Sequence, residues 1–100
     1  MSRQERSAPI DDTLLSLEEL CRIGAVDTAW VRERVGIGAL TTVTMTEERW
    51  LFEPAAIERV RRMWRVERDF DAVPELAALV ADLEAEIHRL RARLRAAGLT

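Results

Sequence analysis

The ionisable side chains in the first half of this sequence are mostly acidic. Residues 1–52 hold six Arg and nine Asp or Glu, which gives that stretch a net charge of −3. Complementary charge favours binding to a basic protein partner, whereas phosphate groups are repelled by carboxylates. Five residues of this stretch are the candidate partner-binding residues: Asp27, Glu33, Glu47, Glu48 and Arg49.

Few residues of this chain are of the types and spacing that catalysis requires. The one histidine, His88, falls at an outward position of a helical repeat, where a solvated side chain is favoured over a ligand. The one cysteine, Cys21, cannot form an internal disulfide and falls on an apolar helix face, which favours a small buried side chain. Neither a glycine-rich phosphate loop nor a nucleophile elbow is present. We therefore predict no enzymatic activity, no metal and no cofactor.

Two short predicted helices position the first acidic residues. Ser16 and Glu19 form a capping box that opens a helix through Ile23, and Gly24 is predicted to end it as a left-handed C-terminal residue. Asp27 is the predicted N-cap of a second helix over residues 28–35. Two short helices joined by a tight turn predict a helix-turn-helix.

A small hairpin follows and carries the remaining candidates. Residues 41–45 and 49–52 alternate in polarity, and Thr46, Glu47 and Glu48 lie between them. A hairpin of this size is marginal alone, so Trp50 or Phe52 must pack on the helices. The pattern is typical of the wing of a winged helix-turn-helix.

A third helix is predicted to begin with Pro54 as its first residue. One face is apolar and comprises Ile57, Val60, Met63, Trp64, Val66 and Phe70. The other is basic and comprises Arg59, Arg61, Arg62, Arg65 and Arg68. Glu58 and Glu67 interrupt the basic face, so a solvated face is favoured and a partner contact stays open.

The last quarter of the chain follows a heptad repeat. With Val73 at position a, all eight a and d positions up to Ala97 are apolar, which is the seam of a coiled coil. The predicted dimerisation residues are Leu76, Val80, Leu83, Ile87, Leu90 and Leu94. The four acids of residues 73–87 precede the four arginines of residues 88–97, an order that favours an antiparallel homodimer. The alternative is that the stripe packs on the first half of the same chain.

These elements predict a mainly α fold: a winged helix-turn-helix with a small β-hairpin wing and a long C-terminal dimerisation helix. Three segments are expected: a flexible tail at residues 1–12, the winged domain at 13–71 and the coiled-coil helix at 72–100. No apolar run approaches the ~20 residues of a membrane span, and the polar start lacks a signal-peptide pattern. A cytoplasmic protein is expected.

In order, these elements resemble the plan of MerR-type regulators from about Leu14 to Leu94. Within that group the local match resembles the chaperone-modulator family CbpM. The segments that carry the resemblance are 17–21, 29–31 with Val35 and 38–40, 49–52, 59–70, 79–83 and 86–94. Gly36-Ile37 departs from the family, which tends to be polar there, and Ala72-Val73-Pro74 shortens or breaks the joint before the last helix.

The resemblance implies binding to the J-domain of a DnaJ-like co-chaperone of the CbpA type, with inhibition of its stimulation of Hsp70. The rival hypothesis is a MerR-type DNA-binding transcriptional regulator. DNA affinity depends on phosphate neutralisation by basic residues, and the net negative first half opposes it. Any single acid here can instead serve only as a helix cap or a solubilising charge. An adaptor for an unrelated protein partner also stays open.

Overall fold

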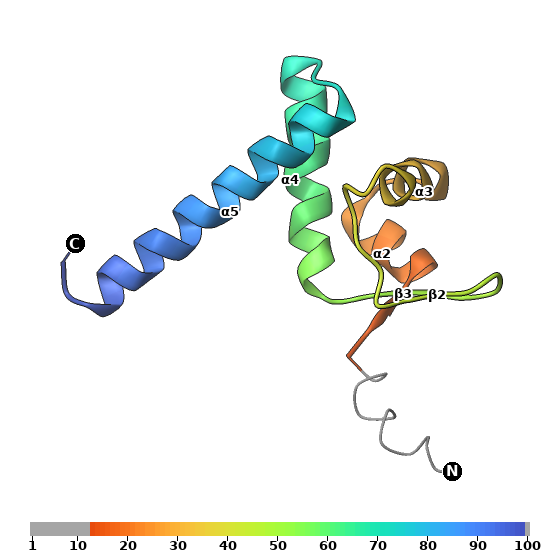
Figure 1. The fold of residues 1–100 in the computed structure, drawn as a ribbon, viewed down its shortest axis with the longest axis horizontal. Coiled ribbons are helices and arrows are strands. Elements are labelled where there is room, and N and C mark those ends of the chain that lie inside the picture. Colours follow the sequence, from red (N-terminus) through yellow and green to blue (C-terminus); the bar gives the residue numbers. More distant parts are fainter. Residues whose placement is uncertain (1–12, 100) are drawn as a thin grey trace, which may run out of the picture. The chain divides into compact units, whose positions relative to one another are not determined.

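The computed structural model describes residues 13–99 of the chain, so the predicted tail at residues 1–12 lies outside the described residues. The fold is mainly helical, with one small three-stranded antiparallel sheet (Figure 1). The predicted fold class is thereby confirmed. The chain forms two compact units, Met1–Arg61 and Arg62–Thr100, and helix α4 (Ala55–Phe70) runs across their boundary.

Helix α2 (Leu17–Gly24) begins at the predicted capping box. The Ser16 hydroxyl accepts a hydrogen bond from Glu19 N at 3.1 Å, and Ser16 N donates to Glu19 Oε1 at 2.8 Å. The predicted role of Gly24 was wrong: Gly24 is the last helical residue, and Ala25 adopts the left-handed conformation with φ 60°. A Cβ at Gly24 would lie 3.0 Å from Val60 Cγ1, so the glycine allows α2 to approach α4 closely.

Helix α3 (Thr28–Gly36) follows after a short turn and completes the helix-turn-helix. Its N-cap is Asp27, as predicted, and the Asp27 carboxylate accepts a hydrogen bond from Trp30 N at 2.8 Å. Beyond the helix, Gly38 takes a positive φ of 82°, which turns the chain so that Ala39 and Leu40 return to the core.

The wing is a sheet of three strands, one more than the sequence pattern predicts. Strands β2 (Thr44–Met45) and β3 (Trp50–Phe52) form the predicted hairpin, with Thr44 opposite Leu51. Strand β1 (Leu15–Ser16) pairs with the other edge of β3, which gives the order β1-β3-β2. Two residues are too few to show an alternating pattern, which is why β1 escaped prediction.

The first unit has its core beneath this sheet and the two short helices. Leu20, Val31, Phe52 and Val60 are fully buried, so Phe52 fastens the wing to the helices as expected. The loop before the wing is held by Arg59, whose Nε donates to Ala39 O at 2.7 Å.

The second unit contains the later turns of α4 and helix α5 (Pro74–Ala96). Met63 and Val66 of α4 and Ala77 and Ala81 of α5 are buried. The apolar face of α4 is narrower than predicted, because Phe70 is 76% exposed and the Arg68 guanidinium covers one side of the partly exposed Trp64 ring at 4.7 Å.

The predicted seam of α5 lies on a different face from Ala77 and Ala81. Val80 is half-buried. The other five seam residues are between 41% and 56% exposed, namely Leu76, Leu83, Ile87, Leu90 and Leu94. Within one chain, therefore, the face of α5 that is buried is formed by alanines, and the heptad leucines stay open to solvent. Among the described residues, no helix combines the length and apolar character needed to traverse a lipid bilayer.

Candidate functional site

A small hollow brings the tip of the wing together with the two short helices. It has a volume of about 100 Å³ and is called the wing hollow below. Its lining residues are Ser16, Leu17, Glu18, Arg32, Glu47, Glu48, Arg49 and Trp50. Three of the five predicted partner-binding residues, Glu47, Glu48 and Arg49, are thus brought to one place.

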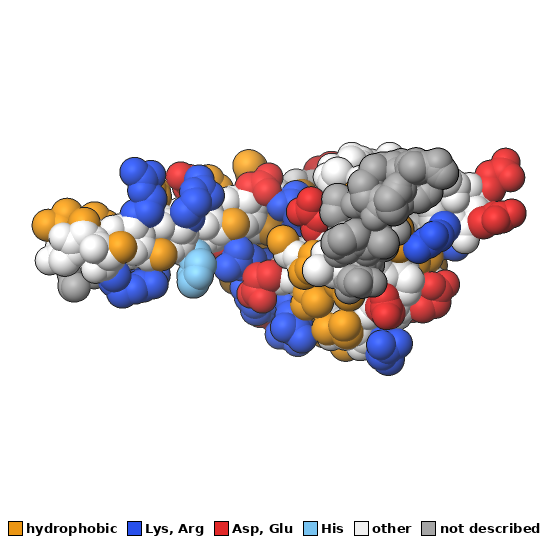
Figure 2. Space-filling model, turned by 90° about the horizontal axis from the view of Figure 1, so that it is seen from below, with side chains coloured by type: hydrophobic (Ala, Val, Ile, Leu, Met, Phe, Trp, Pro, Cys, Tyr) orange, Lys and Arg blue, Asp and Glu red, His pale blue; other side chains and the backbone are white. Residues whose placement is uncertain are grey.

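A tight turn fixes the acidic tip of the wing. Thr46 N donates to Arg49 O at 2.9 Å, and the Thr46 hydroxyl accepts from Glu48 N at 3.3 Å and from Arg49 N at 3.0 Å. These bonds occupy the backbone of the turn and leave Glu47 and Glu48 exposed. Figure 2 shows acidic side chains projecting at the right-hand end of the molecule, where the wing of Figure 1 lies.

Arg32 and Trp50 join α3 to the wing. The Arg32 guanidinium carbon lies 4.9 Å from the centre of the Trp50 ring, which is cation–π distance. The sequence pattern did not reveal the other five lining residues of the wing hollow, namely Ser16, Leu17, Glu18, Arg32 and Trp50. Nothing in their spacing reveals the contact, because it joins the first turn of one helix, the middle of another and a strand.

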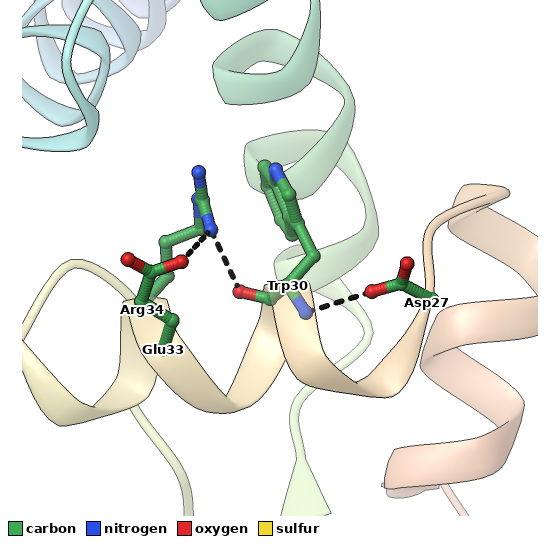
Figure 3. A network of polar contacts seen from close by, with 4 residues as sticks. All are labelled: Asp27, Trp30, Glu33 and Arg34. Carbon is green, nitrogen blue, oxygen red and sulfur yellow. Dashed lines mark hydrogen bonds and ion pairs between the residues drawn. The ribbon is translucent and has the colours of Figure 1, made fainter.

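A second polar network, on α3, surrounds Arg34, whose side chain is buried (Figure 3). Arg34 Nη1 donates to Trp30 O and to Glu33 Oε1, both at 3.0 Å, and the guanidinium carbon lies 4.1 Å from the Trp30 ring centre. Arg34 is only 6% exposed, whereas the Glu33 side chain is 65% exposed. The positive charge is covered and its carboxylate partner faces solvent.

The exposed surface of the winged part is consequently acidic. From Leu17 to Phe52 five carboxylates and three guanidinium groups are exposed, a balance of −2. The carboxylates are those of Glu18, Asp27, Glu33, Glu47 and Glu48, and the guanidinium groups are those of Arg22, Arg32 and Arg49. Asp27 and Glu33 lie on α3 and do not line the wing hollow, so the predicted candidates divide between the wing tip and α3.

Cys21 is buried, as the sequence indicates. Burial raises the pKa of its thiol, and the nearby carboxylates of Glu18 and Asp27 raise it further. The thiol is therefore protonated at neutral pH, which is the unreactive form. Within residues 13–99 no three His, Cys, Asp or Glu side chains are grouped so that they could hold a metal ion.

A helix-turn-helix, a hairpin wing and a long terminal helix define the winged helix-turn-helix class of regulators. The chain belongs to the MerR HTH family of regulatory proteins, whose family model matches residues 15–97. It is accordingly a MerR-like regulator. A comparison with curated proteins found no match.

Proposed function

We propose that this protein is a chaperone modulator, which binds the J-domain of a DnaJ-like co-chaperone of the CbpA type and inhibits its stimulation of Hsp70. The observation that carries the proposal is the acidic balance of the exposed wing and helices in a chain of a DNA-reading fold. The resemblance of segments such as 17–21 and 49–52 to the CbpM family supports it.

The mechanism is occlusion and needs no catalytic group. A J-domain acts on Hsp70 through a basic helix beside a His-Pro-Asp turn. Glu47 and Glu48 at the wing tip, with Glu18 at the edge of the wing hollow, offer carboxylates to such a helix. The half-buried Trp50 ring beside them supplies apolar contact area. A J-domain held in this way cannot dock on Hsp70.

The test is binding to a purified J-domain at physiological salt, with Hsp70 ATPase stimulation as the functional readout. Two opposite charges about 4 Å apart in water are worth about 1 kcal/mol, so reversing one carboxylate is expected to weaken binding by about 5- to 30-fold. Glu47→Lys and Glu48→Lys test the wing. Glu75→Lys is the matched control, since it makes the same change of charge at an exposed position of α5. Equal affinities for all three variants would remove the wing from the interface.

The second candidate is DNA binding, which the family match itself favours. Exposed Arg22, Arg32 and Arg49 provide some positive charge. A gel shift on the promoter of the protein's own operon tests it. DNA binding at physiological salt with no J-domain affinity would favour the repressor. If the protein binds neither DNA nor the J-domain, an adaptor for another protein partner is favoured. A co-chaperone gene beside this gene would argue against such an adaptor.

The same chain is proposed to form an antiparallel homodimer through α5. The seam side chains are about half exposed in the single chain, and completing the burial of each is favourable by about 1 kcal/mol. Acidic residues occupy the first half of the helix and arginines the second, so antiparallel chains place opposite charges side by side. Sedimentation equilibrium tests this assembly. A monomer at protein concentrations of tens of micromolar would contradict it.

A further inference from the structure

We propose that two copies pair in one particular antiparallel register, in which the partner's Glu84 is bound by Arg91 at the edge of a basic hollow. This inference rests on the proposed homodimer and specifies its geometry. It starts from a hollow of about 340 Å³ in the second unit, called the basic hollow below, whose lining residues are Arg62, Arg65, Glu84, Ile87, His88 and Arg91.

The lining of the basic hollow includes three arginines and one carboxylate. Three guanidinium groups surround Glu84, which accepts a hydrogen bond from Arg65 Nη2 at 3.2 Å. Within the described residues, Arg91 makes no hydrogen bond, ion pair or ring contact. A carboxylate from outside the chain would therefore give Arg91 a partner, because the planar guanidinium can bind a carboxylate through two parallel hydrogen bonds.

The exposed side chain of Ile87 connects this hollow to the seam of α5. In antiparallel coiled coils an a residue faces a d residue of the partner. With Ile87 facing the partner's Leu90, Leu83 faces the partner's Leu94 by the same spacing. Val80 then faces the partner's Ala97, so every seam position from 80 to 97 has an apolar neighbour.

The flanking charges agree with this register on both sides of the seam. On one side Glu84 lies opposite the partner's Arg91, and on the other Glu86 lies opposite the partner's Arg93. The twofold symmetry repeats each pair, so four ion pairs form. Each Glu84 then lies between its own Arg65 and the partner's Arg91, so each Arg91 gains the carboxylate that it lacks within one chain.

Registers displaced by one heptad are opposed by like charges. Displacement in one direction sets Glu84 against the partner's Glu84 and Glu86 against the partner's Glu86. Displacement in the other sets Arg91 and Arg93 against their own copies. A parallel pair keeps only the contact of Glu86 with the partner's Arg91. Only the proposed register gives each of the four residues Glu84, Glu86, Arg91 and Arg93 a partner of opposite charge.

Cysteine cross-linking in a Cys21→Ala background reads the register directly. Leu83→Cys with Leu94→Cys places thiols opposite each other in the proposed register. Val80→Cys with Leu90→Cys is the matched control, because it does so only in the register displaced by one heptad. Leu83→Cys alone reports a parallel pair. Thiols 10 or 11 residues apart on one helix are separated by roughly 15 Å, so a disulfide within one chain is excluded.

The expected result is near-complete covalent dimer for the first pair and little for either control. Cross-linking of either control as complete as that of the first pair would overturn the register. A charge swap gives an independent measurement. Glu84→Arg or Arg91→Glu alone is expected to raise the dimer dissociation constant about tenfold, and the double variant to return it to within about threefold. A double variant as weak as the singles would also overturn the register.

These outcomes separate the register from the proposals on which it rests. A wild-type monomer contradicts the homodimer itself. A dimer that cross-links through Val80→Cys and Leu90→Cys keeps the homodimer and removes the register. The proposed J-domain interface lies on the winged part. A positive or negative result for J-domain binding therefore leaves the cross-linking result unchanged.

Discussion

At the scale of single residues, the burial of one arginine makes the exposed surface of the winged part more acidic. The sequence places Arg32 and Arg34 together on α3, where both could meet a phosphate backbone. In the structure Arg34 is buried against Trp30 and only Arg32 reaches solvent. The distinction depends on the position of the Trp30 ring and on packing, neither of which the sequence displays.

Arg34→Ala is expected to lower the free energy of unfolding by about 2 kcal/mol. The substitution removes a ring contact and leaves Trp30 O without the guanidinium donor. Arg32→Ala removes a similar ring contact at an exposed position, so a loss of only about 0.5 kcal/mol is expected. Urea unfolding of the two variants measures both values. Equal losses would show that burial of Arg34 does not matter.

Asp27 combines two roles that substitution can separate. Its carboxylate caps α3 through Trp30 N, and its charge contributes to the acidic surface. Asp27→Asn keeps the cap and removes the charge, so stability is expected to change by less than about 0.5 kcal/mol. Asp27→Ala removes both the cap and the charge, and loss of the cap is expected to lower the free energy of unfolding by about 1 kcal/mol. Thermal unfolding gives the stabilities. If J-domain affinity falls equally in both variants, the charge is what the partner recognises, whereas wild-type affinity in the asparagine variant would show that Asp27 acts only as a cap.

At the scale of elements, most boundaries follow from local chemistry. The capping box at Ser16 and the Asp27 cap mark helix starts that the sequence predicts. Strand β1 and the role of Gly24 were misjudged because both depend on contacts with distant segments. Leu15 pairs with Phe52, and Gly24 approaches Val60, and no local pattern encodes either contact.

Gly24→Ala is expected to lower the free energy of unfolding by about 1–2 kcal/mol, because the added methyl group would lie 3.0 Å from the fully buried Val60. Gly36→Ala is the matched control. It lies at the last position of α3 with nothing within 4 Å of its Cβ, and a gain of up to ~1 kcal/mol is expected from helix propensity. Denaturant unfolding of the pair checks both signs. A stabilised Gly24→Ala would show that α4 can move away without cost.

At the scale of the whole molecule, a nucleic-acid-reading fold has a predominantly acidic exposed surface on its winged part. The predicted candidates Glu47, Glu48 and Arg49 do converge at one hollow, while Asp27 and Glu33 lie apart on α3. Composition alone predicted the sign of this surface, because residues 1–52 hold nine acids and six arginines. It could not predict the hollow, since Glu18, Arg32 and Trp50 come together only through the tertiary fold.

The electrostatic account also predicts how binding responds to salt. Exposed charges are screened over about 8 Å at physiological ionic strength and about 3 Å at 1 M. The association rate with a J-domain is therefore expected to fall as salt increases, with a smaller change in the dissociation rate. Stopped-flow mixing across a salt series measures both. An association rate that does not depend on salt would mean that apolar contacts alone drive the encounter.

The most direct measurement compares two titrations at 150 mM salt: the protein with a purified CbpA-type J-domain, and the protein with a duplex of its own promoter. Saturable binding to the J-domain is expected, weakened by Glu47→Lys and Glu48→Lys but not by Glu75→Lys, together with no specific binding to the duplex. Tight, sequence-specific binding to the duplex with no affinity for the J-domain would contradict it.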